Sequence, residues 1–205
     1  MKLLETIKYQ NGNFSNLSFH QRRMDNALKD LFADRFVIDL QSELEKTPKP
    51  KSWTRELYKC RVIYSEGVDK IEFHPYSFPK INSLKLIEDN TISYSHKYSD
   101  RNNLEKLFAQ RQECDDILIV KNGLITDTSF CNILFFNGKK WLTPEKPLLI
   151  GTQRQFLLDN EIIETANISP ADVHNFEKAR LVNAMICFED NLEIEIKAVC
   201  GNVLG

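Results

Sequence analysis

The hydrophobic pattern of the first third of the chain predicts a helix packed on a small antiparallel sheet. Residues 3–9 have strand-forming character and end at Asn11-Gly12, a turn pair that favours positive φ. From about residue 18, apolar side chains recur every three or four positions, as they do on the buried face of a helix. Residues 58–73 then alternate apolar and charged side chains around a central turn, which predicts two half-buried strands.

The rest of the chain predicts a second, larger part with a mostly antiparallel sheet. The segment 75–79, with a proline at each end, is the best position for a link between the two parts. Two further Asn-Gly pairs, at 122–123 and 137–138, each follow a β-rich run and predict hairpins. The predicted helices here cover 100–108, 152–159 and 169–178, and the predicted strands cover 83–87, 116–120, 132–136, 140–143, 181–187 and 192–199. We therefore expect an α+β fold with a small domain over residues 1–78 and a larger domain over residues 79–205.

The overall charge and composition exclude several classes of function. The chain has 205 residues, a formal net charge of −2 and a pI near 6.1, which argues against nucleic acid and anionic membranes as partners. No apolar stretch reaches the ~18 residues of a membrane-spanning helix. The N-terminus turns polar too early for a secretory signal, so we expect a cytoplasmic protein. The five cysteines are scattered without metal-ligand spacing, which predicts free thiols and no metal site.

Three separated groups suit the chemistry of pyridoxal phosphate. Lys97 supplies an amine, Asp127 an acid beside a predicted strand, and Gly151-Thr152-Gln153 a turn at the start of a predicted helix. An amine can join this cofactor as a Schiff base, an acid can keep its ring nitrogen protonated, and helix N–H groups can bind its phosphate. No single group is specific, but their order and spacing along the chain predict this cofactor.

Four short motifs resemble those of a known enzyme family. They are Leu4-Glu5-Thr6-Ile7 for its Phe-Glu-Thr-Ile, His20-Gln21-Arg22-Arg23-Met24 for its His-x-x-Arg-Leu, Thr126-Asp127 with Asn132 for its Thr-Glu-x-x-x-x-Asn, and Gly151-Thr152-Gln153-Arg154 for its Gly-Ile-Thr-Arg. On these motifs, most of the chain resembles the class IV (branched-chain and D-amino acid) aminotransferase family, which includes 4-amino-4-deoxychorismate lyase. The resemblance implies the two-domain D-amino acid aminotransferase-like fold, fold type IV of the pyridoxal phosphate enzymes. The family's glycine-rich segment ahead of the first strand is missing, so we expect a fold truncated at its N-terminus.

The resemblance implies a role for each matching residue. Lys97 corresponds to the family's Schiff-base lysine and proton carrier, and Asp127 to the glutamate that pairs with the ring nitrogen. Because Asp is one methylene shorter than Glu, the backbone or the ring must come closer. Arg23 corresponds to the phosphate-binding arginine, and its neighbour Arg22 points about 100° away on the same helix. Further cofactor contacts are implied for Asn132, Gly151, Thr152 and Gln153, with the threonine one position earlier than in the family.

Substrate contacts are implied by position alone. Arg61 and Tyr64 lie on the predicted strand where the family places substrate-recognition residues, and Asn183 lies in a segment that resembles the family's late Asn-Ser segment. Alternation along a strand would place Arg61 on the same face of the sheet even if it did not bind substrate. A core strand explains the segment around Asn183 equally well.

The family implies two reactions that use the same residues. Transamination of a small amino acid is the expected one, and it returns the amine to a keto acid. The alternative is the lyase reaction, which eliminates pyruvate from 4-amino-4-deoxychorismate and leaves 4-aminobenzoate. A third hypothesis, motivated by Asp127 and the shifted threonine, is a non-catalytic binding protein with this fold. Family members are homodimers, so a homodimer is expected.

Overall fold

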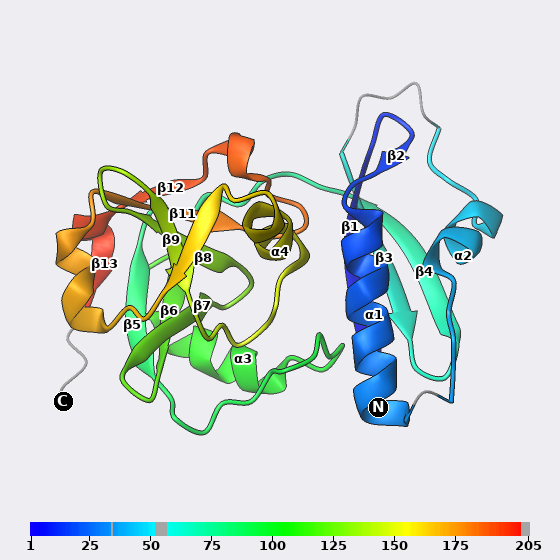
Figure 1. The fold of residues 1–205 in the computed structure, drawn as a ribbon, viewed down its shortest axis with the longest axis horizontal. Helices are drawn as coiled ribbons and strands as arrows, with labels where there is room; N and C mark the ends of the chain where they lie inside the picture. Colours follow the sequence, from blue (N-terminus) through cyan, green and yellow to red (C-terminus); the bar gives the residue numbers. More distant parts are fainter. Residues whose placement is uncertain (34, 52–56, 202–205) are drawn as a thin grey trace. The chain divides into compact units, whose positions relative to one another are not determined.

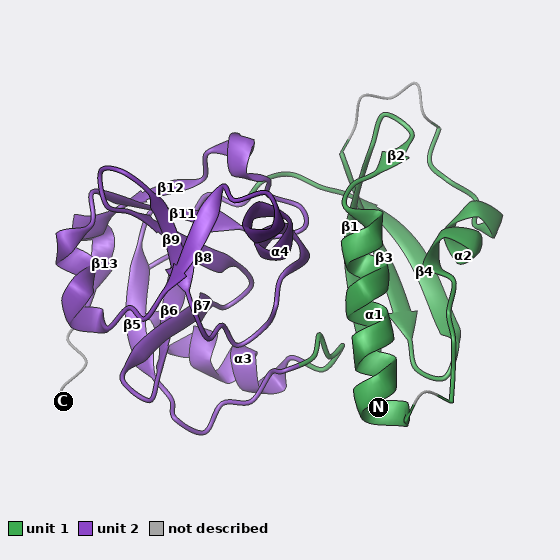
Figure 2. Cartoon of the chain, in the orientation of Figure 1, with its two compact units in different colours: residues 1–78, 96–100 green, residues 79–95, 101–205 purple. Residues whose placement is uncertain are grey.

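The computed structural model describes residues 1–33, 35–51 and 57–201 (Figure 1). The chain divides into two compact units (Figure 2): unit 1 comprises residues 1–78 and 96–100, and unit 2 comprises residues 79–95 and 101–205. The division after residue 78 falls where the sequence placed the domain boundary. Both units combine helices with a sheet.

Residues 96–100 belong to unit 1, which corrects the expectation that Lys97 lies in the second domain. The backbone N–H of Leu4 donates to the carbonyl oxygen of Lys97 (2.9 Å). Tyr98 also forms an isolated antiparallel bridge with Leu3. The chain therefore returns to the first strand of unit 1 before it continues. Composition gives no sign of this return, because it depends on pairing between residues far apart in the sequence.

Unit 1 is a four-stranded antiparallel sheet with two helices. Its strands are β1 (Leu3–Gln10), β2 (Asn13–Phe14), β3 (Tyr58–Tyr64) and β4 (Val68–Pro75), in the order β2-β1-β3-β4. Its helices are α1 (Leu17–Phe32) and the short α2 (Leu40–Lys46), which was not predicted. Asn11 and Gly12 both have positive φ (52° and 81°), so the predicted turn joins β1 to β2. Asp39 caps α2 by accepting the N–H of Ser42 (3.0 Å).

Alternation along β1 and β3 gives the unit 1 sheet one apolar face. Leu3 and Ile7 of β1 share this face with Cys60 and Val62 of β3, and all four side chains are fully buried. Helix α1 covers them with its own buried residues, Met24, Ala27 and Leu28. Burying a large apolar side chain in this way stabilises a fold by roughly 1.5–3 kcal/mol.

Unit 2 contains a mixed nine-stranded sheet in the order β10-β9-β8-β7-β6-β5-β13, and off this path β11 pairs with β8 and β12. Its strands are β5 (Leu84–Glu88), β6 (Asp116–Lys121), β7 (Leu124–Thr128), β8 (Asn132–Phe136), β9 (Trp141–Pro144), β10 (Ile163–Ala166), β11 (Lys178–Val182), β12 (Glu193–Glu195) and β13 (Val199–Cys200). Its α-helices are α3 (Asn102–Phe108) and α4 (Thr152–Asp159). The strands from β6 to β9 are antiparallel, whereas β5 pairs parallel with β6 and β13, and β9 with β10.

The C-terminal elements differ from the prediction. The helix expected over 169–178 is a 3-10 helix, η2 (Pro170–Asn175), and only Val173 within it is buried, too little apolar surface for an α-helix. The strand expected over 181–187 is β11, which ends at Val182. The strand expected over 192–199 is interrupted by η4 (Ile196–Ala198). The remaining 3-10 helices are η1 (Ala109–Arg111) and η3 (Phe188–Asp190).

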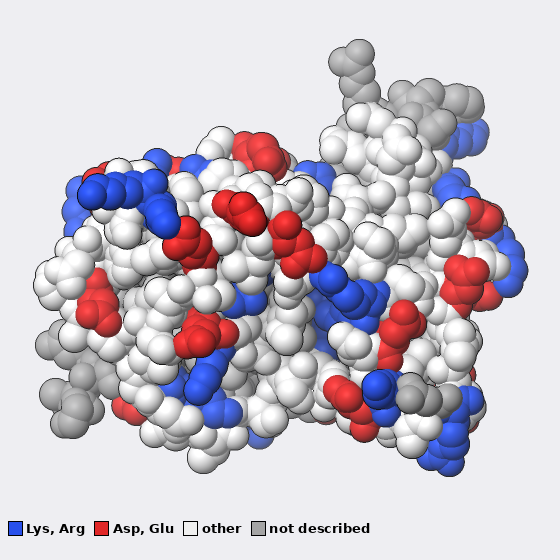
Figure 3. Space-filling model, viewed as in Figure 1, with Lys and Arg blue, Asp and Glu red and all other residues white. Residues whose placement is uncertain are grey.

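The charged side chains of the described residues are of both signs on the face shown in Figure 3. Across residues 1–33, 35–51 and 57–201, no helix has the length and apolar character that a membrane crossing requires. Within the same ranges, no group of three or more His, Cys, Asp or Glu side chains could hold a metal ion.

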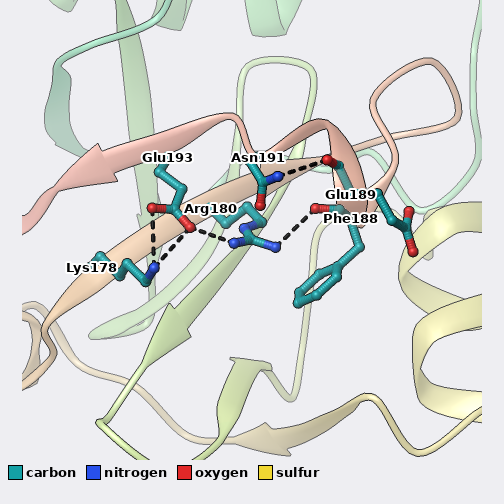
Figure 4. A network of polar contacts seen from close by, with 6 residues as sticks. All are labelled: Lys178, Arg180, Phe188, Glu189, Asn191 and Glu193. Carbon is teal, nitrogen blue, oxygen red and sulfur yellow. Dashed lines mark hydrogen bonds and ion pairs between the residues drawn. The ribbon is translucent and has the colours of Figure 1, made fainter.

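Arg180 of β11 connects several elements of unit 2 (Figure 4). Its Nη1 donates to the carbonyl oxygen of Phe188 (2.8 Å), and its Nη2 pairs with Glu193 of β12. The guanidinium also lies over the rings of Trp141 (4.5 Å) and Phe188 (4.2 Å). Lys178 donates to both oxygens of the same Glu193 carboxylate (3.0 and 3.1 Å). One largely buried cation thus ties β9, β11, β12 and η3 together.

We expect Arg180→Ala to lower the free energy of unfolding by about 2–4 kcal/mol, because it removes charge-assisted hydrogen bonds and ring contacts from a buried position. Lys178→Ala is the matched control. It removes a second cation from the same carboxylate, but the Lys178 side chain is 39% exposed, so we expect a loss below about 1 kcal/mol. Urea unfolding followed by circular dichroism measures both. Equal losses would contradict a special role for Arg180.

Candidate active site

Unit 1 brings one buried carboxylate together with two nitrogen-bearing side chains. His20 and Arg23 lie one turn apart on α1, so both can reach β1, where Glu5 is fully buried. Arg23 donates from Nε to Glu5 Oε1 (2.9 Å) and from Nη2 to Glu5 Oε2 (2.5 Å). His20 Nδ1 lies 2.6 Å from the same Oε2. Glu5 therefore orients Arg23, the predicted phosphate ligand.

These partners also set the charge of Glu5. Burial alone would raise the pKa of its carboxyl group, but the Arg23 charge and the His20 hydrogen bond outweigh burial and hold the pKa at about 2. Burial lowers the pKa of His20; the Glu5 contact opposes this shift, and the charges of Arg23 and Lys97 add to it. At neutral pH the group therefore consists of an ionised Glu5, a neutral His20 and a charged Arg23.

Lys97 lies beside this group. Its carbonyl oxygen is bonded to Leu4, the residue before Glu5, and its side chain is half-buried. Its charge is close enough to His20 to lower the pKa of that imidazole. The structure thus places two predicted site residues, Lys97 and Arg23, around the same pair of buried polar side chains.

Three other polar residues of unit 1 lie in different surroundings. Arg22 is exposed, and its guanidinium lies over the Phe19 ring (4.8 Å), as expected for the arginine that points away. Arg61 is ion-paired with Glu72 across the sheet (3.7 Å), on the face opposite α1. Tyr64 is only 1% exposed in the core of the unit, and burial raises the pKa of its hydroxyl. This burial gives Tyr64 a packing role, and its contact with substrate stays a prediction.

In unit 2 a second buried carboxylate, that of Asp127, is held at both oxygens. Asp127 of β7 pairs directly with Asn132 of β8, and Asn132 Nδ2 donates to Asp127 Oδ1 (2.7 Å). The N–H of Leu149, in the loop before α4, donates to Asp127 Oδ2 (2.9 Å). Asn132 Nδ2 also donates to the Leu149 carbonyl oxygen (3.0 Å), which ties the loop to the sheet. A carboxylate oxygen has two lone pairs, so Asp127 can still accept a further donor such as a protonated ring nitrogen.

The two buried acids titrate in opposite directions. Burial raises the pKa of Asp127 to about 6, although its hydrogen bonds and the charge of Arg154 act against burial. Arg154 of α4 is itself buried, and its Nη2 donates to the carbonyl oxygen of Pro144 (2.8 Å) rather than to the acid. Glu5, in direct contact with a guanidinium, titrates low, whereas Asp127, in contact with neutral donors, titrates high. Asp127 is therefore ionised at neutral pH but takes up a proton just below it.

Gly151 precedes α4 and lies directly against Asn132. A Cβ at position 151 would be 1.9 Å from Asn132 Oδ1, so a larger residue would displace that amide. Gly151 provides no side-chain cap, and a helix start of this kind can bind a phosphate through its first backbone N–H groups. Thr152 and Gln153 form the first turn and are 3% and 2% exposed. The predicted phosphate turn and the predicted ring-nitrogen acid are thus connected through Asn132.

Asn183 closes a tight turn after β11. Its Oδ1 accepts the N–H groups of Met185 (2.8 Å) and Ile186 (3.0 Å). Its Nδ2 lies 3.1 Å from the sulfur of Cys131, which directly precedes Asn132. Both ends of the Asn183 amide therefore have structural partners, and its contact with substrate stays a prediction.

Glu5, His20 and Arg154 were not predicted as site residues, although all three lie within the quoted motifs. For Glu5 the sequence did contain a pattern that could have indicated a buried, paired carboxylate. Strand alternation puts it on the buried face between Leu3 and Ile7, and a buried charge requires a partner. The identity of that partner depends on how α1 packs, which the pattern along β1 does not contain.

Comparisons with known proteins cover both units. Residues 2–188 match the family model described as Amino-transferase class IV. An uncharacterized protein of Haemophilus influenzae is 36% identical over 183 residues, which is 89% of this chain and 97% of that protein. The crystal structure of a candidate 4-amino-4-deoxychorismate lyase from Haemophilus somnus 129PT is 34% identical with a TM-score of 0.82, over 91% of this chain and 97% of that one. The pyridoxal phosphate-bound form of a hypothetical aminotransferase from Mycobacterium tuberculosis shares the fold (TM-score 0.70, 16% identity), over 98% of this chain and 81% of that one.

We expect Glu5 to stabilise the protein at neutral pH and to lose this effect in acid. Its pKa of about 2 in the folded protein lies below the ordinary value of 4.5, so the contribution is full above pH 4.5 and disappears as the pH falls from 4.5 towards 2. The difference corresponds to about 3 kcal/mol. In urea unfolding at pH 7, Glu5→Gln should lose about this amount, and its stability should depend less on pH in acid. Glu66→Gln, in an exposed turn, should change stability by less than about 0.5 kcal/mol.

Gly151→Ala should destabilise the protein by about 1–3 kcal/mol, because the added methyl group overlaps Asn132 Oδ1. The displaced amide would also loosen the hold on Asp127. Gly67→Ala is the control, since nothing lies within 4 Å of a Cβ at that position, and we expect a change within about 0.5 kcal/mol. Thermal unfolding of both variants checks this. An unchanged melting temperature of Gly151→Ala would contradict the expectation that stability depends on the position of the Asn132 amide.

Proposed function

The chain belongs to the class IV aminotransferase family and is a pyridoxal phosphate-dependent enzyme, and we propose that it cleaves 4-amino-4-deoxychorismate to pyruvate and 4-aminobenzoate. The observation that carries this choice of reaction is the 34% identity, over 91% of this chain, to the candidate lyase from Haemophilus somnus. The proposal reverses the order expected from the sequence, which put transamination first. The lyase reaction needs no second substrate, because the amine stays on the aromatic product.

Each unit, taken by itself, contains residues whose chemistry suits this cofactor. Asp127 is a buried carboxylate that can accept one more donor, and Gly151 opens a helix without a side-chain cap. Arg23 offers a guanidinium that Glu5 holds in place. When bound, pyridoxal phosphate supplies an electron-poor ring that stabilises the negative charge left when a proton leaves the carbon beside the amine.

We assign the proton transfer to Lys97. Its Nζ would bind the cofactor covalently in the resting enzyme and would then carry a proton to and from the substrate carbon. This role needs a neutral amine, and the neighbouring His20, whose pKa is lowered, adds no positive charge at neutral pH. Glu5 offsets the charge of Arg23 in the same group. The surroundings of Lys97 are therefore polar but close to electrically balanced.

Asp127 would keep the cofactor's ring nitrogen protonated. With a pKa of about 6, its carboxylate is ionised at neutral pH and can stabilise a positive charge on that nitrogen. Asn132 would act as its support. As the pH falls below about 6, the carboxyl group gains a proton and loses this ability, so activity should decline on the acid side.

We propose phosphate contacts for each unit separately: Arg23 in unit 1, and the turn at Gly151, Thr152 and Gln153 in unit 2. Backbone N–H groups do the binding at a helix start, so the position of the threonine does not decide whether the turn works. Arg61, Tyr64 and Asn183 are the proposed substrate contacts, as their positions in the sequence predict. A homodimer and a cytoplasmic location complete the proposal.

Transamination of a small amino acid is the second candidate, because the family model that matches the chain is described as an aminotransferase family. It would use Lys97 and Asp127 in the same roles and would differ only in needing a keto acid acceptor. The presence of both residues weighs against the third hypothesis, a non-catalytic binding protein.

We expect the purified protein to take up pyridoxal phosphate with a visible absorption band, and borohydride reduction to leave the cofactor covalently on Lys97 in peptide mass analysis. Lys97→Ala should lose the band and at least about 1,000-fold of activity, while Lys106→Ala, exposed on α3, should keep both. Asp127→Ala should bind the cofactor more weakly, and Asp127→Glu, which restores the family's residue, should bind it better than the alanine variant. A protein that stays colourless with added cofactor would overturn the proposal.

The loaded enzyme also decides between the two reactions. Release of pyruvate and 4-aminobenzoate from 4-amino-4-deoxychorismate, with no keto acid present, would support the lyase. Exchange of an amino group between an amino acid and a keto acid, with no cleavage of 4-amino-4-deoxychorismate, would assign transamination instead.

A further inference from the structure

Cys114 and Cys200 are anchored to the same short stretch of unit 2, at the start of β5. Strand β13 pairs parallel with β5, with Cys200 opposite Lys85. On the other side, Asp115 follows Cys114 directly and is bonded to Ser83. The Asp115 N–H donates to Ser83 Oγ (3.0 Å), and its Oδ2 accepts the Ser83 N–H (3.2 Å). The two cysteines, far apart in the sequence, are therefore each held within a residue or two of Ser83–Lys85.

The two thiols act on each other. Burial and the Cys200 thiol raise the pKa of Cys114, and Ser83 and Lys85 act in the opposite direction. The Lys85 ammonium also lies next to the residue after Cys200, since a Cβ on Gly201 would be 3.3 Å from Lys85 Nζ. The net shift of the Cys114 pKa is upward, and the form of a thiol that attacks a disulfide is the thiolate.

The accessibility of the thiols separates this pair from two other cysteines. Cys200 is exposed and Cys114 is half-buried, so a small oxidant can reach them. Cys60 and Cys131 are buried, and burial raises the pKa of Cys60 to about 12, which makes its thiol inert. Cys187 is half-buried like Cys114 and offers a natural control.

We propose that Cys114 and Cys200 form a reversible disulfide site whose oxidant is a low-molecular-weight disulfide such as glutathione disulfide. One protein thiolate attacks a sulfur of the oxidant, which forms a mixed disulfide and releases one glutathione thiolate. The second protein thiolate then attacks the protein-bound sulfur of that mixed disulfide, which closes the Cys114–Cys200 bond and releases the second glutathione. The two protein thiols lose two electrons and two protons, and one glutathione disulfide becomes two molecules of glutathione.

The bond would secure the edge of the unit 2 sheet. Strand β13 is only two residues long and pairs with β5 alone on the sheet path, so it is an element that opens easily. A link from Cys200 to the segment before β6 closes a long loop and restricts that opening. Oxidation should therefore slow amide hydrogen exchange at Val199 and Cys200 without altering the fold.

The test uses the full-length protein in defined mixtures of reduced and oxidised glutathione. The chain has five cysteines, and we expect the number of free thiols to fall by two, with the loss reversed by dithiothreitol. Unreduced peptide mapping should recover the peptide of Cys114 joined to the peptide of Cys200. Cys187→Ser should still lose two thiols, whereas Cys114→Ser and Cys200→Ser should each keep the remaining partner as a mixed disulfide with glutathione.

Three results would overturn the proposal: a constant thiol count, mixed disulfides on both cysteines of the native sequence, or a bond to any other cysteine. Serine is close to cysteine in volume, and the melting temperature of each variant shows whether it is folded. The readout does not involve catalysis, so its outcome is independent of the reaction proposed above.

Discussion

The burial of one carboxylate, that of Asp127, is the constraint on which the candidate site in unit 2 depends. An acid removed from water needs hydrogen-bond donors. Asn132 supplies one because β8 begins directly opposite Asp127, and Leu149 supplies the other because the loop before α4 comes back to the sheet. Gly151 follows two residues later and packs on the Asn132 amide. The hydrogen bonds of a single acid therefore position both the acid itself and the start of α4.

In unit 1 a buried carboxylate, that of Glu5, is stabilised by a positively charged partner. Glu5 is as deeply buried as Asp127, but it contacts a guanidinium through two hydrogen bonds and remains ionised far into acid. Asp127 has neutral donors and a more distant arginine, so burial prevails and its pKa rises to about 6. The difference suits the roles proposed for them. Glu5 orients Arg23 and needs a permanent charge, whereas Asp127 would hold a proton on the cofactor's ring nitrogen and is ionised at neutral pH.

Turn pairs and apolar spacing predicted much of the fold. They succeeded because each depends only on residues close together in the sequence. Asn11-Gly12 and Asn122-Gly123 have positive φ at both positions and join antiparallel strands, as such pairs favour. Helix α1 was predicted because apolar side chains recur at helical spacing from Met24 to Phe32. The short α2 has only two buried residues, too few to form a period.

The candidate site residues were proposed from local signals of the same kind. Lys97, Asp127 and Gly151 were proposed from their order along the chain, which a sequence contains. The membership of Lys97 in unit 1 and its closeness to His20 depend on pairing across most of unit 1, which a sequence pattern does not contain. Glu5 shows the limit clearly, because its burial follows from alternation but its bond to Arg23 follows only from the packing of α1 on the sheet.

The two departures from the family's motifs are compatible with the proposed chemistry for one physical reason. Asp127 has one rotatable bond fewer than Glu, so less side-chain entropy is lost when it is held, and the backbone of β7 sets its position more directly. Its donors are brought to it by Asn132 and Leu149. Thr152 shifts a hydroxyl by one position but leaves the backbone N–H groups of the first turn in place. In both cases the backbone sets the position of the group that the cofactor would contact: the Asp127 carboxylate on β7, and the N–H groups at the start of α4. The hydrogen bonds between Asp127, Asn132 and Leu149 hold these two stretches of backbone together.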